Sequence, residues 1–155
     1  MGDEFYAQLT THLEFLGYAV DRQDDGWCLA RHPRRYDFFF KEMRQGVVRF
    51  HAAVRIGSTA DLKWRREALE AINALNEDSS IAKYTLKEDE REYGVRIRAT
   101  LPGTYERGLF GDLIDLWHTE LGRIDKLPGL PKAAVALPDG DDDEAVEEKS
   151  PQVVN

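Results

Sequence analysis

The sequence contains a single cysteine, Cys28, and no long apolar run. One cysteine excludes an intramolecular disulfide and a cysteine-clustered metal site, so we expect Cys28 to be a small buried residue of a strand. No apolar stretch approaches the roughly 18 residues of a membrane-spanning helix. The first residues are acidic and amphipathic, whereas a signal peptide begins with basic residues and continues with an apolar stretch. These absences predict a cytoplasmic protein that does not bind membranes.

The sequence also lacks the motifs of cofactor binding and catalysis. It has no phosphate loop, no dinucleotide-binding fingerprint and no nucleophile elbow. Its four histidines are spread over different predicted elements without the spacing of metal ligands: His12, His32, His51 and His118. Carboxylate pairs such as Asp112 and Asp115 lie on predicted helix surfaces, where nothing indicates general acid–base catalysis. We therefore expect no enzymatic activity, no cofactor and no metal.

The acidic character of the chain is concentrated toward its C-terminus. The net charge is -8, and the segment from residue 126 onward contributes half of it, with seven acidic and three basic residues. That segment also holds four of the six prolines and shows no periodicity, so residues 126–155 are predicted to form a disordered tail. Residues 1–125 are long enough, and the chain is apolar enough at 42% hydrophobic residues, to form one folded domain.

The folded part switches between helical and strand periodicity. The helical ranges are 4–17, 58–76 and 104–124, and the strand ranges are 27–31, 36–42, 47–57 and a hairpin over 81–103. The resulting order, α-β-β-β-α-β-β-α, predicts an α+β domain with one five-stranded antiparallel sheet and helices packed on it.

Alternation within the strands divides the predicted sheet into an apolar face and a basic face. In residues 47–57 the apolar residues share one face, and Arg49, His51 and Arg55 share the other. Of the three consecutive phenylalanines at 38–40, the middle one falls on the basic face. The candidate partner-binding residues are therefore Phe39, Arg49, His51, Arg55, Arg96 and Arg98.

This basic face has two interpretations. It is either an ordinary solvated surface, with one aromatic ring covered by arginine stems, or a surface that binds an acidic or amphipathic segment of another protein. Arginine and aromatic residues dominate interface energetics, which favours the second interpretation. The acidic tail of the same chain is a further hypothesis for the occupant of this face. Single-stranded nucleic acid, stacked on the aromatic ring among the arginines, is the alternative partner.

The predicted second helix is apolar over an unusually wide arc. Leu62 and Leu69 form a stripe displaced from the main stripe by about a quarter turn or more. The main stripe supplies the candidate dimer-interface residues Trp64, Ala68, Ala71, Ile72 and Leu75. A helix of this kind contacts both its own sheet and a second subunit, unless another helix of the same chain covers the extra stripe.

The order of elements, the central segment WCLARHPRRYDFFFKEMRQGVVRFHAAVRIG and the helix end AINALNEDSSIAKYTL resemble the YbjN-like proteins over about residues 4 to 124. Leu75 and Asn76 match the LN with which the second helix of that family ends before the next strand. The YbjN-like proteins resemble, in fold, the class I type III secretion chaperones, which are small acidic homodimers that hold extended segments of client proteins. The resemblance implies a non-enzymatic, chaperone-like or regulatory homodimer with a stress-linked role. It also implies that the second helix lies near the dimer interface and that the sheet and first helix grip the client.

Overall fold

The computed structural model describes residues 2–43, 47–57, 62–88, 93–102, 105–126 and 135–136. Within these ranges the side chains of residues 2–3, 55–57, 62–64, 93, 102, 126 and 135–136 lie outside the described part. The described helices are α1 (Gly2–Phe15), α2 (Leu62–Asp78), α3 (Arg107–Gly122) and the short 3-10 helix η1 (Arg123–Lys126). The described strands are β1 (Ala19–Arg22), β2 (Cys28–Arg31), β3 (Phe38–Met43), β4 (Val47–Gly57), β5 (Ala82–Glu88), β6 (Tyr93–Pro102) and β7 (Val135–Ala136).

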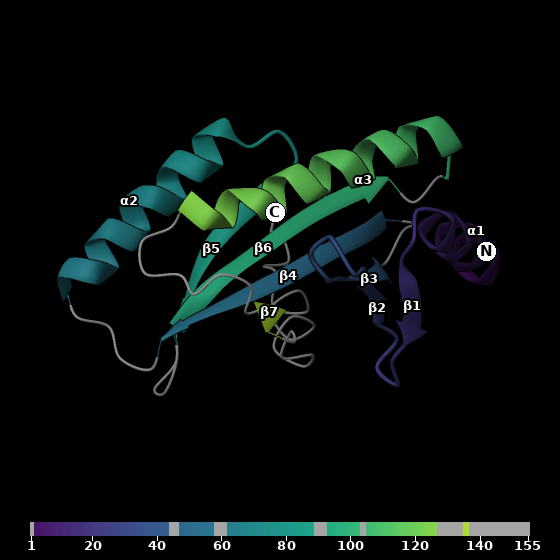
Figure 1. Ribbon diagram of the computed structural model, residues 1–155, viewed down its shortest axis with the longest axis horizontal. Coiled ribbons are helices and arrows are strands. Elements are labelled where there is room, and N and C mark those ends of the chain that lie inside the picture. Colours follow the sequence, from purple (N-terminus) through teal and green to yellow (C-terminus); the bar gives the residue numbers. More distant parts are fainter. Residues whose placement is uncertain are drawn as a thin grey trace, which may run out of the picture.

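The strands form one antiparallel sheet in the order β1-β2-β3-β4-β6-β5, and β7 pairs with β4 (Figure 1). The predicted α+β class is confirmed, but the predicted number of five strands is wrong. Residues Ala19–Arg22, which lie outside the predicted strand ranges, form β1 and pair with β2. Three of these four residues are exposed, so β1 carries almost none of the apolar alternation that identifies a strand in a sequence.

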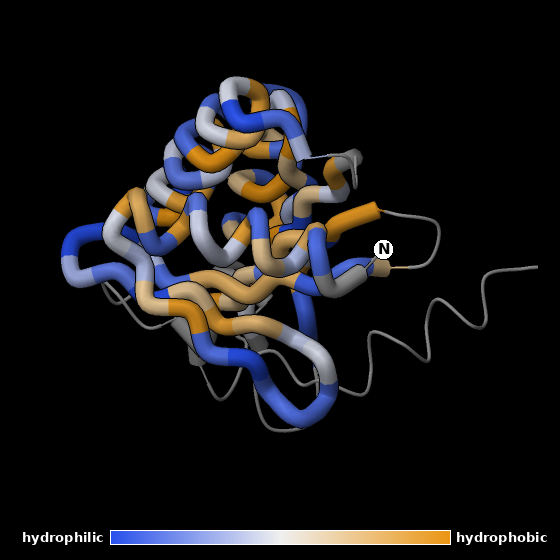
Figure 2. The backbone as a smooth tube through the Cα atoms, turned by 90° about the vertical axis from the view of Figure 1, so that its right-hand side faces the viewer, coloured by the Kyte–Doolittle hydropathy of each residue, from blue (hydrophilic) through white to orange (hydrophobic). Residues whose placement is uncertain are grey.

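α1, α2 and α3 all pack on one face of the sheet (Figure 1). The centre of this core is aromatic: the rings of Phe38, Phe40, Phe50 and Trp117 have neighbouring centroids 5.2 to 6.4 Å apart. Each such buried side chain contributes about 1.5–3 kcal/mol of transfer free energy. The predicted phase of the strands is confirmed, because Phe38 and Phe40 belong to this core and Phe39 does not. In Figure 2, several extended stretches of the backbone are coloured hydrophobic, and loops that join them are coloured hydrophilic.

α1 ends where the sequence predicts, at a glycine. Gly17 has a φ of 94°, in the left-handed region that glycine adopts without a steric penalty. Its N–H donates to the Glu14 carbonyl at 3.0 Å, and the Tyr18 N–H donates to the Leu13 carbonyl at 2.9 Å. These bonds satisfy the last carbonyls of the helix and turn the chain toward β1.

The asparagine of the LN pair fixes α2 to β5, which is an edge strand of the sheet. The Asn76 amide donates to the Tyr84 carbonyl at 2.9 Å and accepts from the Tyr84 N–H at 2.8 Å. The side chain therefore makes the two hydrogen bonds that a neighbouring strand would make there. This arrangement covers part of an edge that would otherwise be open to another chain.

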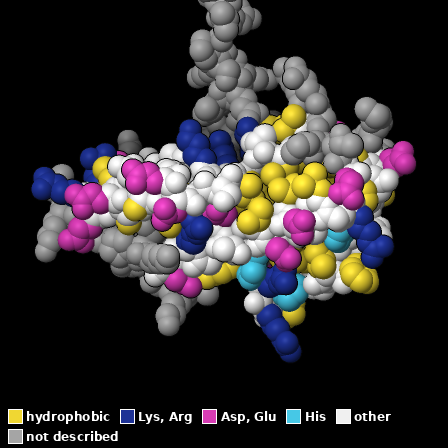
Figure 3. Space-filling model, turned by 90° about the horizontal axis from the view of Figure 1, so that it is seen from above, with side chains coloured by type: hydrophobic (Ala, Val, Ile, Leu, Met, Phe, Trp, Pro, Cys, Tyr) yellow, Lys and Arg dark blue, Asp and Glu magenta, His cyan; other side chains and the backbone are white. Residues whose placement is uncertain are grey.

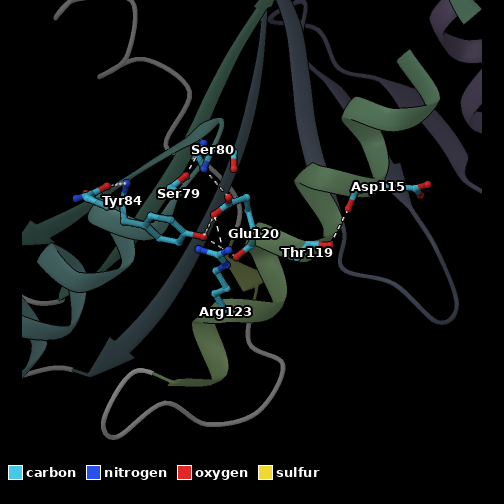
Figure 4. A network of polar contacts seen from close by, with 9 residues as sticks. Ser79, Ser80, Tyr84, Asp115, Thr119, Glu120 and Arg123 are labelled. Atoms are coloured by element: carbon cyan, nitrogen blue, oxygen red, sulfur yellow. Dashed lines mark hydrogen bonds and ion pairs between the residues drawn. The ribbon is translucent and has the colours of Figure 1, made fainter. Parts of the chain in front are cut away.

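A buried carboxylate joins α3 to the same region (Figure 4). Glu120 is 2% exposed, and its backbone oxygen and Oε2 both lie 2.6 Å from the Tyr84 hydroxyl, which donates to them. The Ser80 N–H donates to Glu120 Oε1 at 3.1 Å. Burial, followed by the bond to Glu120, raises the pKa of Tyr84. The phenol therefore stays a hydrogen-bond donor at any physiological pH.

Part of the segment predicted to be disordered lies in the sheet. Val135 and Ala136 pair with β4, while residues 127–134 and 137–155 lie outside the described residues, so the boundary predicted at residue 125 stays a prediction. Of the helices in the described ranges, none combines the length and the apolar character needed to cross a membrane.

Candidate functional site

The outer face of the sheet is the face opposite the three helices. The register aligns one row of residues across it, from β2 to β5: Leu29, Phe39, His51, Arg98 and Lys83. Directly paired side chains of adjacent antiparallel strands have Cβ atoms about 4.5–5.5 Å apart. Three of the six predicted partner-binding residues, Phe39, His51 and Arg98, are therefore immediate neighbours.

Two further predicted residues lie in the flanking rows of the outer face. These rows are Lys41–Arg49–Thr100 on one side and Ala53–Arg96–Thr85 on the other. Arg49, Arg96 and Arg98 are half-buried. Arg55 pairs with Gly94 at the far end of β4, and its side chain lies outside the described residues.

The sequence led us to expect Phe39 to be the one aromatic residue on this face, but it has apolar neighbours there. It is 4% exposed and packs with Trp27, at 2%, and Leu29, at 7%, in a cluster separate from the main core. We call these three residues the outer cluster. The Trp27 ring meets the His51 ring edge-on, with centroids 5.8 Å apart, and the Lys41 ammonium lies 5.8 Å from the Trp27 ring centroid. The prediction of a single ring among cations is thus corrected. The outer cluster forms a small apolar floor, and Lys41, Arg49 and Arg98 form a cationic border around it.

A tight turn between β1 and β2 holds Trp27 in this position. The Trp27 N–H donates to Asp25 Oδ1 at 3.1 Å, and the Gln23 N–H donates to the Trp27 carbonyl at 2.7 Å. Gly26 has a φ of 86°, which allows the chain to reverse over four residues. Lys41 donates from Nζ to the Asp25 carbonyl at 3.0 Å, so the turn also anchors one cation of the border.

His51 forms the centre of the outer face and remains uncharged. It is 2% exposed, and burial is the main cause that lowers its pKa to about 3. The positive charges of Arg98, Arg96, Lys87 and Arg49 lower the pKa further. Because the imidazole stays neutral at physiological pH, arginine and lysine side chains carry the positive charge of this face.

Trp27 and Leu29 also belong to the outer face, and the strand patterns of the sequence did not identify them. The usable signal is the pair of small residues in β2, since Cys28 and Ala30 pack in the main core. Alternation then sends Trp27 and Leu29 to the opposite face. The buried position expected for Cys28 is confirmed, at 3% exposed.

The predicted dimer-interface residues are largely buried within their own chain, and their contact with a second subunit stays a prediction. Ala68, Ile72 and Leu75 are 1%, 4% and 7% exposed, and Ile72 and Leu75 belong to the main core of their own chain. Ala71 is partly buried against the same core. Contact with a second subunit through this stripe would require α2 to leave the sheet. The side chain of Trp64 lies outside the described residues.

The second apolar stripe of α2 does reach solvent. Leu69 is 37% exposed in a shallow concavity whose other lining residues are polar: Arg65, Arg66, Glu70 and Asn73. Arg65 forms an ion pair with Glu88 of β5 at 2.6 Å. Any contact of this part of α2 with another chain would therefore combine one leucine with a charged surround.

A second concavity lies between α1 and the start of α3. It has a volume of about 500 Å³ and is lined by Glu4, Ala7, Gln8, Thr11, His12, Phe15, Tyr105 and Arg107. Phe15 is 76% exposed, and the Arg107 guanidinium lies 5.8 Å from its ring centroid. Figure 3 shows other apolar side chains gathered in the middle of the helix-covered side, between acidic and basic ones. The first helix thus exposes the apolar side chain of Phe15, and the contact with a client that the family resemblance implies stays a prediction.

Within the described residues, no group of three or more histidine, cysteine, aspartate or glutamate side chains has the arrangement of a metal site. The outer face can instead bind anionic groups through its arginines and lysines, and apolar groups through its floor. This combination suits a polypeptide segment that carries both kinds of side chain.

No family model matches the chain, and no curated protein matches its sequence. Among solved structures, the chain is similar to YbjN from E. coli, which is described as a proposed transcription regulator, with a TM-score of 0.57 and 13% identical residues. The match covers 79% of this chain and 87% of that chain. At this identity the likeness concerns the fold alone, and the chain has a YbjN-like fold.

Proposed function

We propose that this chain is a cytoplasmic, non-enzymatic protein-binding module, chaperone-like or regulatory, whose outer face takes an acidic, amphipathic segment of another protein. The observation that carries the proposal is the outer cluster of Trp27, Leu29 and Phe39 bordered by Arg49 and Arg98. An apolar floor accepts apolar side chains, and the cationic border selects carboxylates over neutral or basic partners. The binding is therefore specific for a chemical pattern rather than for a single reactive group.

The experiment compares two charge-reversed variants in affinity capture from extract of the native cells. Arg96→Glu with Arg98→Glu reverses two cations of the outer face. Arg22→Glu with Arg34→Glu is the matched control, because it makes the same change in net charge at two exposed residues, one in β1 and one in the turn between β2 and β3. We expect a specific partner to be lost only from the outer-face variant. A partner list unchanged in that variant refutes the proposal, and loss from both variants points to non-specific charge attraction.

The proposed module acts as a homodimer. Since the main stripe of α2 is buried in the monomer, Leu69 is the apolar residue through which we place α2 in contact with a second copy. Light scattering at micromolar concentration should give the mass of two chains, and Leu69→Arg should give the mass of one. A monomeric mass for the native chain rules out the homodimer at that concentration.

A nucleic-acid-associated regulator is the second candidate, favoured by the arginines of the outer face. Sequence-tolerant binding of single strands also requires aromatic faces on which bases stack. The outer cluster supplies Trp27 and Phe39 for this, but the net charge of -8 opposes binding to a phosphate backbone, which is why we rank this function second. A gel shift with an oligodeoxythymidine of about 16 nucleotides tests it. A salt-sensitive shift that Arg96→Glu with Arg98→Glu abolishes would reverse the ranking.

A further inference from the structure

We propose that residues 135–148 of the same chain are the resident occupant of the outer face: they pair with β4 through β7 and then lay their acidic side chains across the cationic border. The sequence alone offers only the opposite charges of tail and face. The register of β7 shows where the tail joins the sheet and in which direction it runs.

The place is a stretch of β4 that β3 does not reach. β3 pairs with β4 from Met43 opposite Val47 to Phe39 opposite His51, while β4 continues to Gly57. β7 pairs with β4 beyond this point, with Ala136 opposite Ala53 and Val135 opposite Val54. β7 therefore extends the sheet in line with β3, on the same edge of β4.

The direction follows from continuing this antiparallel register. Residue 137 would lie opposite Ala52, and Pro138 would lie opposite His51, where Phe39 is already paired. Proline has no N–H and cannot continue a ladder of backbone hydrogen bonds. If this register continues, the chain would leave the plane of the sheet by Pro138, next to Phe39 and His51. The helices occupy one face there, so the exit leads onto the outer face.

The residues that follow the exit have the charge that this face requires. They are Asp139, Asp141, Asp142, Asp143, Glu144, Glu147 and Glu148. An extended chain advances about 3.3 Å per residue and strands are about 4.8 Å apart, so six residues beyond Pro138 span about four strands. That length carries the acidic run past Lys41, Arg49 and Arg98. An occupant of this kind also agrees with the 2–7% exposure of the outer cluster on a face that carries none of the described helices.

A tethered segment competes with any free partner at a local concentration of about millimolar, because it is part of the same molecule. The proposed position of the tail, which we call its seat, is inferred from β7 and its register. The further statement that a partner must displace the tail rests on the proposed function. The tail then sets a threshold: only segments that bind the outer face more tightly than residues 135–148, or that are locally concentrated, gain access.

The first experiment measures hydrogen exchange in the full chain without any partner. Val135→Pro removes one backbone donor of β7, and Val153→Pro, further along the same tail, is the matched control. We expect exchange at whichever of the Ala53 and Val54 amides points toward β7 to become at least about tenfold faster in Val135→Pro and to stay unchanged in Val153→Pro. Unchanged exchange in Val135→Pro overturns the proposed seat.

The second experiment locks the tail in place. Ala53 and Ala136 are direct partners, and the Cα distance of about 4.5–5.5 Å in such pairs permits a disulfide. Ala53→Cys with Ala136→Cys should close under mild oxidation, whereas Ala53→Cys with Val153→Cys should close at least about tenfold more slowly. Each single variant, which retains the buried Cys28, controls for unrelated thiol reactions. Equal rates for the two double variants overturn the seat.

The locked protein also tests the competition, with a fluorescein-labelled peptide of residues 132–148 as the probe. We expect the oxidised protein to bind this peptide at least about tenfold more weakly than the same protein after reduction. Closure of the disulfide without any loss of peptide binding refutes the competition while the seat of the tail stands. Failure of the proposed function would leave the exchange and cross-linking results unchanged, because neither requires a partner.

Discussion

His51 should make the stability of this protein depend steeply on pH in mildly acidic solution. Its pKa is about 3 in the folded chain, against an ordinary value of 6.5. The unfolded chain therefore takes up a proton at a pH where the folded chain does not. The stability associated with the neutral imidazole is complete above about pH 6.5 and is lost as the pH falls toward the folded value.

The magnitude follows from the same two values. A pKa difference of one corresponds to about 1.36 kcal/mol, so the full difference between 6.5 and about 3 amounts to about 4–5 kcal/mol. At about pH 4 most of this loss, about 3 kcal/mol, should already be present. Such a loss is a large fraction of the about 5–15 kcal/mol by which typical domains are stable.

The assay is urea unfolding, followed by tryptophan fluorescence, between about pH 7 and pH 4. His51→Gln also removes the ring contact with Trp27, so its stability at neutral pH will be lower than that of the native chain. The slope with pH is therefore the informative quantity. We expect His51→Gln to lose about 3 kcal/mol less than the native chain over this range.

His12→Gln is the control for this measurement. Burial lowers the pKa of His12 as well, but this residue is only half-buried, and we expect a smaller flattening of the slope. The reasoning is refuted if His51→Gln loses as much stability toward pH 4 as the native chain does. That result would mean that acid reaches the imidazole in the folded protein without penalty.

Three further substitutions test contacts that hold the fold. Tyr84→Phe removes the hydroxyl that donates to buried Glu120 and should cost about 1.5–3 kcal/mol by urea unfolding. Because the pKa of Tyr84 is raised in the folded chain, the native protein should lose stability as the pH rises above about 10, and a variant with the same alkaline loss would contradict this assignment. Asn76→Ala leaves the N–H and carbonyl of Tyr84 without their partner and should cost about 1–3 kcal/mol, whereas a change in the melting temperature too small to detect would mean that water replaces the amide. Gly17→Ala forces a side chain into a φ of 94° and places its Cβ 3.0 Å from His32 Nε2, so it should lower stability by more than about 1 kcal/mol, and an unchanged unfolding midpoint would show that the turn adjusts freely.

The parts of the fold that the sequence predicts correctly are those where two physical requirements coincide. In β4 and β6 the described inward residues are apolar and most of the outward residues are polar. Strand alternation and burial therefore assign each residue to the same face of the sheet. Gly17 is correct for a similar reason, since a helix end and a left-handed residue are both required there. The prediction missed β1 because this edge strand is mostly exposed. Its residues alternate between the faces of the sheet, but burial does not require the inward ones to be apolar.

The outer cluster could be predicted only in part, because its members come from different strands. Alternation alone assigns Phe39 to the outer face, but Trp27 joins it through a turn of four residues and a register that periodicity does not specify. The stripes of α2 show a different limit. Two apolar stripes on one helix do not say which of them packs on the sheet of the same chain, and in this structure the main stripe does so through Ile72 and Leu75.

The outer face carries an electrostatic cost that bears on what it binds. Arg98 is directly opposite Lys83 in the register, and like charges in this position destabilise a sheet unless an anionic group lies beside them. His51, between Phe39 and Arg98, is neutral and relieves none of this repulsion. An anionic segment does relieve it, whereas a neutral segment of the same shape does not. Binding by an acidic segment should therefore contain a part that salt weakens and a part, from the apolar floor, that salt leaves unchanged, and both parts apply equally to the tail and to any partner that replaces it.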